Sequence, residues 1–312
     1  MRMWPRITWA IHITRAVILL GSTACSPIID RTERLLPKEQ SSIAVMSYNL
    51  DGFAYADRNQ DGQADDFKPE AEIEAIVSII ARNNPDILAL QEIGSSNAMA
   101  MLKTRLTGQG CAFSDADFLM PPDGGPGLGI LTKLSITSRD PITNAHYTIQ
   151  NQSYPASRGF QQVDIAAAGG KTLRIINVHL KSKEFHPAGQ TEMRRNEARL
   201  LAAHIRSRRS DTNITSIIAC GDFGDGPASA TLRSLIGEPS KGLIMLNLAD
   251  PQGDAWTSLD RTQSTWSRQH YFLIDPESAQ FVDYKKSGVL GGVEINLASR
   301  HRPLYFTFTV RD

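Results

Sequence analysis

The chain has 312 residues, of which 41% are apolar and 21% are charged, so it can bury the core of one large domain or two small ones. Lys plus Arg and Asp plus Glu each number 33, which gives a formal net charge of zero. This balance excludes a global field that attracts polyanions and argues against generic binding of DNA or RNA, although a local basic patch stays compatible with it.

The amino terminus is typical of an export signal. Basic residues precede a short apolar run, Ala16 to Leu20, which is far below the ~20 residues needed to span a bilayer. The small residues after this run end at Cys25, as in a bacterial lipobox, although Ser22 stands where a lipobox usually has leucine. We expect residues 1–25 to be a signal peptide of lipoprotein type with Cys25 lipidated. A plain secretory signal and a disordered cytosolic tail are the alternatives.

This signal predicts an exported protein of the cell envelope, either an outer-membrane lipoprotein or a periplasmic or secreted protein. Residues 26–41 contain charges and Pro37, and we expect them to tether the domain of residues 42–312 to the membrane. Cys220 belongs to an apolar run, where a small buried thiol is commoner than half of a disulfide. A bridge from Cys220 to Cys111 is therefore not expected, and redox chemistry is not the predicted function.

An apolar run predicts the first strand, about Ile43 to Leu50. The loop after it carries oxygen-bearing side chains at alternating positions and then Gly62, a spacing that suits a hard Ca²⁺ ion. The twelfth position is Lys68 instead of the glutamate of an EF-hand, so a shorter calcium loop is expected. A solvated acidic loop without an ion is the alternative. The structural Ca²⁺ candidates are Asp57, Asn59, Asp61 and Asp65.

Helices and strands alternate in the first half of the chain. Pro69 opens an amphipathic helix that runs to about Asn83, and the following strand ends at Gln91-Glu92. A second helix is predicted at about 97–106, and a short strand at 130–132. This alternation indicates a mixed α/β fold.

Hairpins dominate the second half. The alternating segment Phe160 to Ile165 is predicted to pair with Leu173 to His179 through the turn at Gly169-Gly170. A helix at about 191–209 carries several arginines, most of which we expect on a solvated face, with one or two near His179 able to meet a substrate phosphate. These are Arg194, Arg195, Arg199 and Arg206. A further helix at about 228–236 and a tail with strands at 270–274 and 304–310 complete the predicted elements.

Five polar residues adjoin apolar runs that read as strands. Any one of them alone would be an ordinary strand-flanking residue, but five together favour a single site built from several strand ends. The most prominent is Asp222, which a β-type run delivers into a glycine-rich turn. The five are Asn49, Glu92, His179, Asp222 and His301.

These residues belong to five short motifs, namely Ser47-Tyr48-Asn49, Leu90-Gln91-Glu92, Asn177-Val178-His179-Leu180-Lys181-Ser182, Gly221-Asp222-Phe223 and His301-Arg302-Pro303. In this order the chain resembles the endonuclease/exonuclease/phosphatase superfamily, the fold of DNase I and exonuclease III, over roughly residues 42–310. The resemblance implies a four-layered α/β sandwich, in which two mixed β-sheets are flanked by helices. It also implies a divalent-metal phosphoesterase.

The resemblance further implies a role for each motif residue. Glu92 would bind Mg²⁺ or Mn²⁺, and Asn49 nearby would hold phosphate or support the metal. Asp222 would orient and deprotonate the attacking water, His301 would stabilise the scissile phosphate, and His179 would assist the leaving group. The implied reaction is in-line hydrolysis of a phosphate ester without a covalent intermediate.

Three positions depart from the superfamily pattern. Gly224 stands in place of an asparagine, His270 in place of the aspartate that orients the terminal histidine, and Arg300 in place of another aspartate. Asp275 lies five residues beyond His270, so on a regular strand it faces the other side and is not expected to replace that aspartate. We expect weaker metal binding, competition between Arg300 and the metal for Glu92, and no fixed tautomer for His301. The phosphate-binding candidates are Asn49, Arg158, His270 and Arg300.

Three functional hypotheses follow. The first is an exported metal-dependent phosphoesterase with reduced activity or shifted specificity. The second is a catalytically degenerate member that binds a phosphorylated ligand, and the third is a calcium-stabilised scaffold without a functional cleft. The substrate stays open among small phosphate esters, lipid head groups and nucleic acid, and we expect a monomer that contacts the membrane through its lipid anchor.

Overall fold

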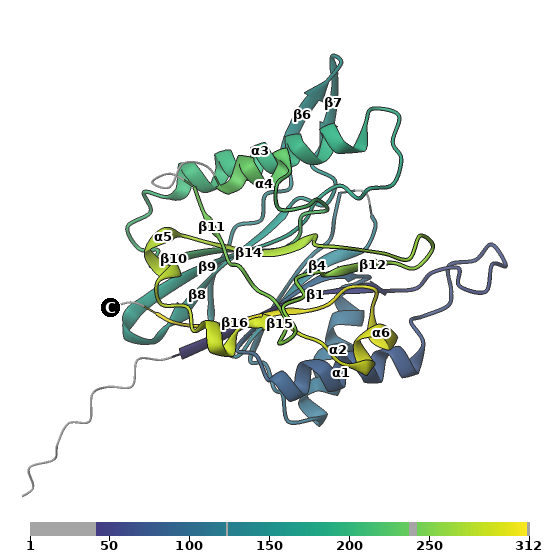
Figure 1. Cartoon of the computed structure of the whole chain (residues 1–312), viewed down its shortest axis with the longest axis horizontal. Coiled ribbons are helices and arrows are strands. Elements are labelled where there is room, and N and C mark those ends of the chain that lie inside the picture. Colours follow the sequence, from purple (N-terminus) through teal and green to yellow (C-terminus); the bar gives the residue numbers. More distant parts are fainter. Residues whose placement is uncertain (1–41, 123, 237–241, 311–312) are drawn as a thin grey trace, which may run out of the picture. The chain divides into compact units, whose positions relative to one another are not determined.

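Two six-stranded mixed sheets face each other in the computed structural model of the chain (Figure 1). The structure describes residues 42–122, 124–236 and 242–310, and residues Gln40–Asp312 form one unit. The predicted signal peptide, the lipidation site at Cys25 and the tether at 26–41 lie outside the described residues.

The first sheet has the strand order β15-β16-β1-β2-β4-β3. The neighbours β1 and β2 are parallel, and the other pairs are antiparallel. The strands are β1 (Ser42–Phe53), β2 (Ile87–Ile93), β3 (Asp115–Leu119), β4 (Gly127–Thr132), β15 (Gly288–Val289) and β16 (Leu304–Thr309).

The second sheet has the order β11-β14-β10-β9-β8-β5, with β9 and β10 parallel. Its central hairpin, β8 with β9, pairs Phe160 with Val178 and Ile165 with Leu173, which confirms the predicted hairpin. The strands are β5 (Ile136–Arg139), β8 (Phe160–Ala167), β9 (Lys171–His179), β10 (Ser216–Asp222), β11 (Ile244–Met245) and β14 (His270–Ile274).

Helices cover the outer faces of both sheets, so the molecule has four layers (Figure 1). The outer face of the first sheet packs against α1 (Glu70–Asn83), α2 (Ser96–Gly108) and α6 (Val293–Ala298). The outer face of the second packs against α3 (Gln190–Arg208) and α4 (Ala230–Ile236). This arrangement confirms the predicted α/β sandwich.

Short elements complete the described chain. Two hairpins lie outside the main sheets, and in Figure 1 the first of them projects beyond α3. The short elements are β6 (His146–Ile149), β7 (Gln152–Pro155), β12 (Ser258–Asp260), β13 (Thr265–Ser267), α5 (Pro276–Ala279), η1 (Ala168–Gly170) and η2 (Tyr284–Lys286). None of the described helices combines the length and the apolarity that a bilayer span requires.

Strand alternation decides which side chains fill the space between the sheets. Val45 of β1 and Ile218 of β10 lie in the apolar core that both sheets share. Because successive side chains of a strand point to opposite faces, Asn49 and Asp222 continue the same faces at the ends of these strands. The apolar pattern that builds the inner core therefore also delivers polar side chains to one end of it.

The loop between β1 and α1 folds back on itself. Asp57 Oδ1 accepts the N–H of Asp61 and Asp57 Oδ2 accepts that of Gly62, both at 3.0 Å. Asp66 Oδ2 accepts the N–H groups of Arg58 and Asn59, so Asp66 closes the loop. Calcium binding by Asp57, Asn59, Asp61 and Asp65 stays a prediction.

Candidate active site

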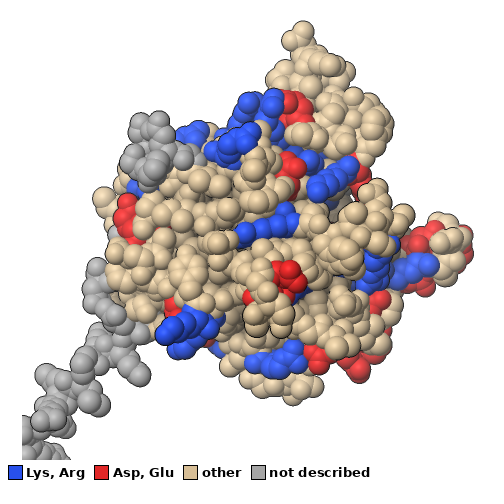
Figure 2. Space-filling view, viewed as in Figure 1, with Lys and Arg blue, Asp and Glu red and all other residues tan. Residues whose placement is uncertain are grey.

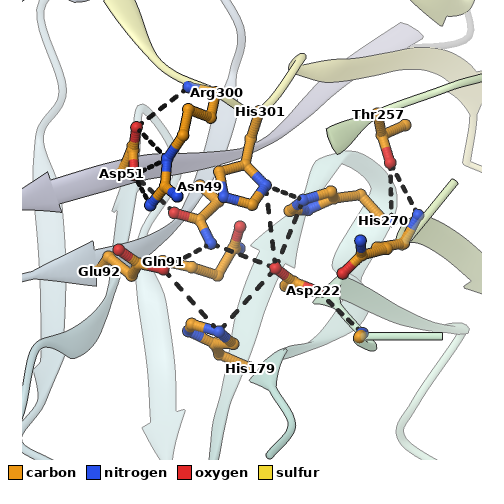
Figure 3. Close-up of polar contacts among 12 residues, drawn as sticks. Asn49, Asp51, Gln91, Glu92, His179, Asp222, Thr257, His270, Arg300 and His301 are labelled. Carbon is orange, nitrogen blue, oxygen red and sulfur yellow. Dashed lines mark hydrogen bonds and ion pairs between the residues drawn. The ribbon is translucent and has the colours of Figure 1, made fainter. Parts of the chain in front are cut away.

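The five residues predicted from the strand ends lie together at one end of the space between the sheets (Figure 3). Parallel pairing places Asp222 of β10 directly beside His179 of β9, and antiparallel pairing places it beside His270 of β14. Asn49 and Glu92 reach the same point from the first sheet. Two sheets thus contribute to one cluster.

Glu92 enters the cluster because of a bulge in β2. Simple alternation would turn Glu92 away from Gln91 and out of the space between the sheets. The register of β2 shifts between Gln91 and Ile93, and Glu92 adopts a left-handed backbone conformation with φ 64°. A bulge of this kind re-aims a side chain, and here it points the carboxylate into the site.

Asn49 bridges the two carboxylates. Its amide Nδ2 donates to Glu92 Oε1 at 3.0 Å and lies 3.3 Å from Asp222 Oδ2, while its Oδ1 accepts the N–H of Asp51. Asn49 is fully buried, and its backbone carbonyl accepts the hydroxyl of Ser299. The geometry makes Asn49 a positioning residue for both acids; its predicted contacts with metal or phosphate stay predictions.

Asp222 is the most enclosed acid of the cluster, with a side chain that is 6% exposed. Its Oδ1 accepts the N–H of Gly224 at 2.8 Å, and its Oδ2 faces His179, His270 and His301. Burial by itself would raise the pKa of Asp222, but the three histidines and the Gly224 amide outweigh burial and hold that pKa well below its usual range. Asp222 is therefore ionised at neutral pH.

His270 partners His301 in the place where the superfamily pattern has an aspartate. The His270 Nε2 to His301 Nδ1 distance is 2.8 Å, and the rings meet edge to face. His301 thus has an imidazole partner instead of a carboxylate, and the expectation that its tautomer is not fixed stays a prediction, because either ring can be the donor. Asp275 does not substitute, as predicted: it accepts the N–H of Ile217 and caps α5.

All three histidines of the cluster are held neutral. Burial lowers the pKa of His301 to about 4, with a further contribution from His270, and burial also lowers the pKa of His270. Burial and the positive charge of Arg158 lower the pKa of His179 well below its ordinary value. His179 Nε2 lies 3.9 Å from both Glu92 Oε1 and Asp222 Oδ2, so it stands between the acids opposite Asn49.

Arg300 binds a carboxylate that the sequence interpretation missed. Its Nε lies 2.9 and 3.0 Å from the two oxygens of Asp51, and its Nη2 also bonds Asp51. The hydrogen bonds with Arg300 overcome burial and lower the pKa of Asp51 to about 2. The expected competition of Arg300 for Glu92 is therefore not seen, since Arg300 pairs with Asp51. The signal for Asp51 was available: it follows Asn49 by two positions at the same strand end.

A layer of buried amides, also missed from the sequence, supports the cluster. Gln91 Nε2 donates to Asn177 Oδ1 at 2.7 Å, and Asn177 Nδ2 donates to Gln161 Oε1 at 3.1 Å. These three residues are fully buried and come from β2, β9 and β8, so the layer connects the two sheets. These hydrogen bonds rigidify what they connect and so help to fix the spacing of the acids above them, although Gln91 Oε1 has no partner among the described residues. Gln91 and Asn177 lie within the quoted motifs, but their pattern alone gives no sign of mutual contact.

The loss of asparagine at position 224 has a packing reason. Gly224 has φ 67°, and a Cβ on it would stand 2.7 Å from Cδ of Arg194. Most arginines of this helix were expected on a solvated face, and Arg194 is an exception. The residue is 2% exposed, donates to the carbonyls of Lys181 and Ser182, and pairs with Asp225. Arg194 thus braces the loop after β9, whereas Arg199 and Arg206 are exposed as predicted.

One cleft reaches the cluster at His301, and a second lies beside Arg158. One, of about 550 Å³, is lined by Arg300 and His301 together with Lys183, Gln269 and the β12–β13 hairpin. The other, of about 380 Å³, is lined by Arg158, Lys181, Tyr154 and His186. In the first cleft His301 lies beside Asp222, and in the second the positive charge of Arg158 lowers the pKa of Glu92 in opposition to burial. Elsewhere, Figure 2 shows Lys and Arg interspersed with Asp and Glu on the face that it presents, without one large basic field.

The carboxylates of the cluster concentrate negative charge, as a site for a hard divalent cation requires. Burial raises the pKa of Glu92, and the nearby charges of Asp51 and Asp222 raise it further, although the Asn49 hydrogen bond lowers it. Negative charge is thus concentrated beyond what Arg300 neutralises, and oxygen ligands of this type suit Mg²⁺ or Mn²⁺. Glu92 and Asp51 would hold such an ion, which would supply charge neutralisation for a bound phosphate.

Solved structures with the same fold come from several sources. The chain resembles the catalytic domain of human nocturnin with bound sulfate, at 18% identity and a TM-score of 0.60, over 86% of this chain and 95% of that one. An endonuclease/exonuclease/phosphatase from Bacteroides vulgatus matches at 15% identity and a TM-score of 0.61, over 87% and 100%. ANGEL2, described as a 2′,3′-cyclic phosphatase, matches at 15% identity and a TM-score of 0.60, over 86% and 95%.

A search among curated protein sequences found no match. The sequence model of the endonuclease/exonuclease/phosphatase family, by contrast, matches residues 46–275, about three quarters of the chain. That range includes four of the five motifs, and the fold agrees with it. The chain belongs to the endonuclease/exonuclease/phosphatase family.

Proposed function

We propose that this protein hydrolyses a phosphate ester with the help of a bound divalent cation. One observation carries the proposal: an ionised Asp222 lies within 4.0 Å of three neutral histidines, and Asn49 connects it to Glu92. Acids and neutral imidazoles beside a cleft that His301 and Arg300 line suit an anionic substrate and an attacking water.

Each side chain has a proposed task. Asp222 orients the water; its lowered pKa makes it a strong hydrogen-bond acceptor but a poor final proton acceptor, so orientation is its main contribution. His301 and His179, both neutral, donate N–H groups to phosphate oxygens on the nucleophile and leaving-group sides. A neutral donor stabilises developing charge without the cost of protonating a buried ring.

We infer the position of the His301 proton from the surroundings of its hydrogen bond with His270. His270 Nε2 lies 3.5 Å from Asp222 Oδ2, closer than His301 Nδ1 at 4.0 Å. A carboxylate favours a donor at the nearer nitrogen, so His270 Nε2–H donates to His301 Nδ1. The proton of His301 then resides on Nε2, where it is available to the substrate.

The proposal is tested by hydrolysis of bis-(p-nitrophenyl) phosphate and p-nitrophenyl phosphate with Mg²⁺ or Mn²⁺. Asp222→Asn keeps the shape of the side chain but removes its charge, and we expect a rate loss of about 10²- to 10⁴-fold. Asp254→Asn, a change in an exposed loop, serves as the matched control and should keep the full rate. Equal background rates for the natural chain and Asp222→Asn over a broad panel of esters would refute the proposal.

A second candidate is a member that binds a phosphorylated ligand without turning it over. The pairing of Arg300 with Asp51 favours it, because a guanidinium occupies one of the acids that would hold a cation. Under this hypothesis the double change His270→Asp and Arg300→Asp creates activity that the natural chain lacks, with Gly224 kept because a Cβ there would stand against Arg194. A natural chain with full activity eliminates it.

We also propose that the protein is exported and held at the membrane through Cys25, as the sequence of its amino terminus indicates. The lipid-anchored protein should partition with membranes and incorporate labelled palmitate in a bacterial host. Cys25→Ser should abolish the labelling and release the protein into the soluble fraction. Unchanged membrane association of Cys25→Ser would remove the anchor from the proposal and leave the hydrolysis unaffected.

A further inference from the structure

We propose that Asp222, His270 and His301 form a binding site for a transition-metal ion of the Zn²⁺ type. This site is separate from the cation that Glu92 and Asp51 would hold, and it shares no residue with it. Among the described residues these three are the group of histidine, cysteine and acidic side chains with ligand atoms close enough to share one ion. The His270 imidazole, where the superfamily pattern has an aspartate, supplies the second nitrogen.

The distances fit an ion of this size. The ligand atoms are Asp222 Oδ2, His270 Nε2 and His301 Nδ1, and they form a triangle with sides of 2.8, 3.5 and 4.0 Å. A point equidistant from these atoms lies about 2 Å from each, which is the usual length of Zn–N and Zn–O bonds. In the ion-free state the two rings share a hydrogen bond instead, and binding replaces that bond with two coordinate bonds.

The backbone of each ligand is fixed before any ion arrives. Asp222 and His270 are direct partners across the β10–β14 ladder. The hydroxyl of Thr257 accepts the N–H of His270, and that of Ser299 accepts the N–H of His301. The side chains of His270 and Asp222 are 1% and 6% exposed, and that of His301 is 11% exposed at the edge of the larger cleft. An ion there has three protein ligands, of which His301 lines the larger cleft.

The donor set selects the class of ion. Two imidazole nitrogens and one carboxylate oxygen suit Zn²⁺, Co²⁺ or Fe²⁺, whereas Mg²⁺ and Ca²⁺ prefer oxygen ligands alone. His301 Nδ1 presents a lone pair in the ion-free state, and His270 Nε2 presents one once its proton has moved to Nδ1 of the same ring. One feature limits the affinity: His270 Nδ1 is buried and has no hydrogen-bond partner among the described residues. The absence of that support weakens binding by about 10- to 100-fold relative to a fully supported site.

The test uses Co²⁺ as a spectroscopic probe on the full-length chain without an affinity tag. We expect one equivalent of Co²⁺ to give the intense visible bands of a four- or five-coordinate site, Zn²⁺ to remove them, and millimolar Mg²⁺ to leave them unchanged. His270→Gln and His301→Gln should each weaken Co²⁺ binding at least about 10-fold. His146→Gln, at an exposed position of β6, is the matched control and should bind as the natural chain does.

Two results would overturn the site: no Co²⁺ bands with the natural chain, or bands that persist unchanged in both His270→Gln and His301→Gln. Thermal unfolding of each variant shows whether a loss of bands reflects unfolding, and His301→Gln, at the cleft edge, still decides if His270→Gln does not fold. The inference is independent of the proposed hydrolysis. Glu92→Gln should lose hydrolysis and keep the Co²⁺ bands, so failure of one proposal is distinguishable from failure of the other.

Discussion

The site has a carboxylate half (Asp51, Glu92 and Arg300) and a histidine half (Asp222, His179, His270 and His301). The two halves hold their negative charge in different ways. Both halves bury negative charge between two sheets. In the carboxylate half a guanidinium with a permanent charge neutralises Asp51, and Glu92 is left with a raised pKa. In the histidine half burial keeps the imidazoles neutral, and Asp222 stays ionised while it accepts hydrogen bonds from Gly224 and Asn49.

This difference separates two kinds of cation chemistry within one cluster. Oxygen ligands at Glu92 and Asp51 favour a hard ion, and nitrogen ligands at His270 and His301 favour a transition metal. Asn49 holds the halves together through its two amide hydrogen bonds. Substitutions that act on one half alone therefore test whether the division is real.

After the loss expected for Asp222→Asn, the largest expected effect is that of Glu92→Gln in the carboxylate half. Glutamine can still accept the Asn49 hydrogen bond, so the geometry persists while the charge that holds a hard cation is lost. We expect the rate of Mg²⁺-dependent hydrolysis to fall by about 10²- to 10³-fold, on the scale of a lost charge contact in a transition state. Initial rates over a Mg²⁺ titration measure it, with Glu74→Gln on the exposed face of α1 as control.

That prediction also distinguishes the halves from each other. If Glu92→Gln and the natural chain follow the same Mg²⁺ titration curve, Glu92 does not hold the cation, and the division of the site into two halves is wrong. If the variant also loses its Co²⁺ bands, the halves are coupled more tightly than the single Asn49 bridge implies.

Acid should destabilise the protein through the histidine half. His301 binds a proton near pH 6.5 when unfolded but only near pH 4 when folded, so the unfolded state binds more protons between these values. The free energy of unfolding therefore falls as the pH is lowered from about 6.5 to about 4, by up to about 3 kcal/mol for this group. The lowered pKa values of His270 and His179 act in the same direction.

Urea unfolding at several pH values measures this effect. His301→Gln should show a shallower fall in stability than the natural chain over the same pH range, because one of the buried bases is gone. Parallel profiles for the two proteins would mean that His301 is protonated as easily in the folded state as in the unfolded one, contrary to its burial.

Much of the fold and the centre of the site could be predicted from the sequence, because both depend on strand periodicity. The runs that end at Asn49, His179 and Asp222 are inner strands, and alternation carries their last polar side chains to the same edge. The first histidine of the tail strand, His270, was recognised as a departure from the pattern. The contact between His270 and His301 was not predicted, because the two residues are 31 positions apart in the sequence.

The contacts that the sequence did not predict share a physical cause. The Asp51–Arg300 pair spans 249 positions, and the amide layer under the site connects residues from three strands. Neither leaves a periodic signal. The burial of Arg194 was missed because a helix arginine is usually solvated, and here the glycine at 224 makes room for it. Tertiary contacts decide these positions, and local patterns do not.

The smallest expected effect belongs to Arg300→Asp, which should strengthen the binding of a hard cation. The change removes a positive charge beside Asp51 and adds an oxygen ligand, so the Mg²⁺ concentration for half-maximal rate should fall by about 10-fold. Because the Arg300 side chain is 50% exposed, its ion pair contributes little to stability, and the variant should fold normally. Arg300→Gln separates the two causes, since it removes the positive charge without adding a ligand and should give a smaller gain. A weaker response to Mg²⁺ in Arg300→Asp would instead show that the guanidinium helps to bind the substrate phosphate, and the carboxylate half would then be an anion site.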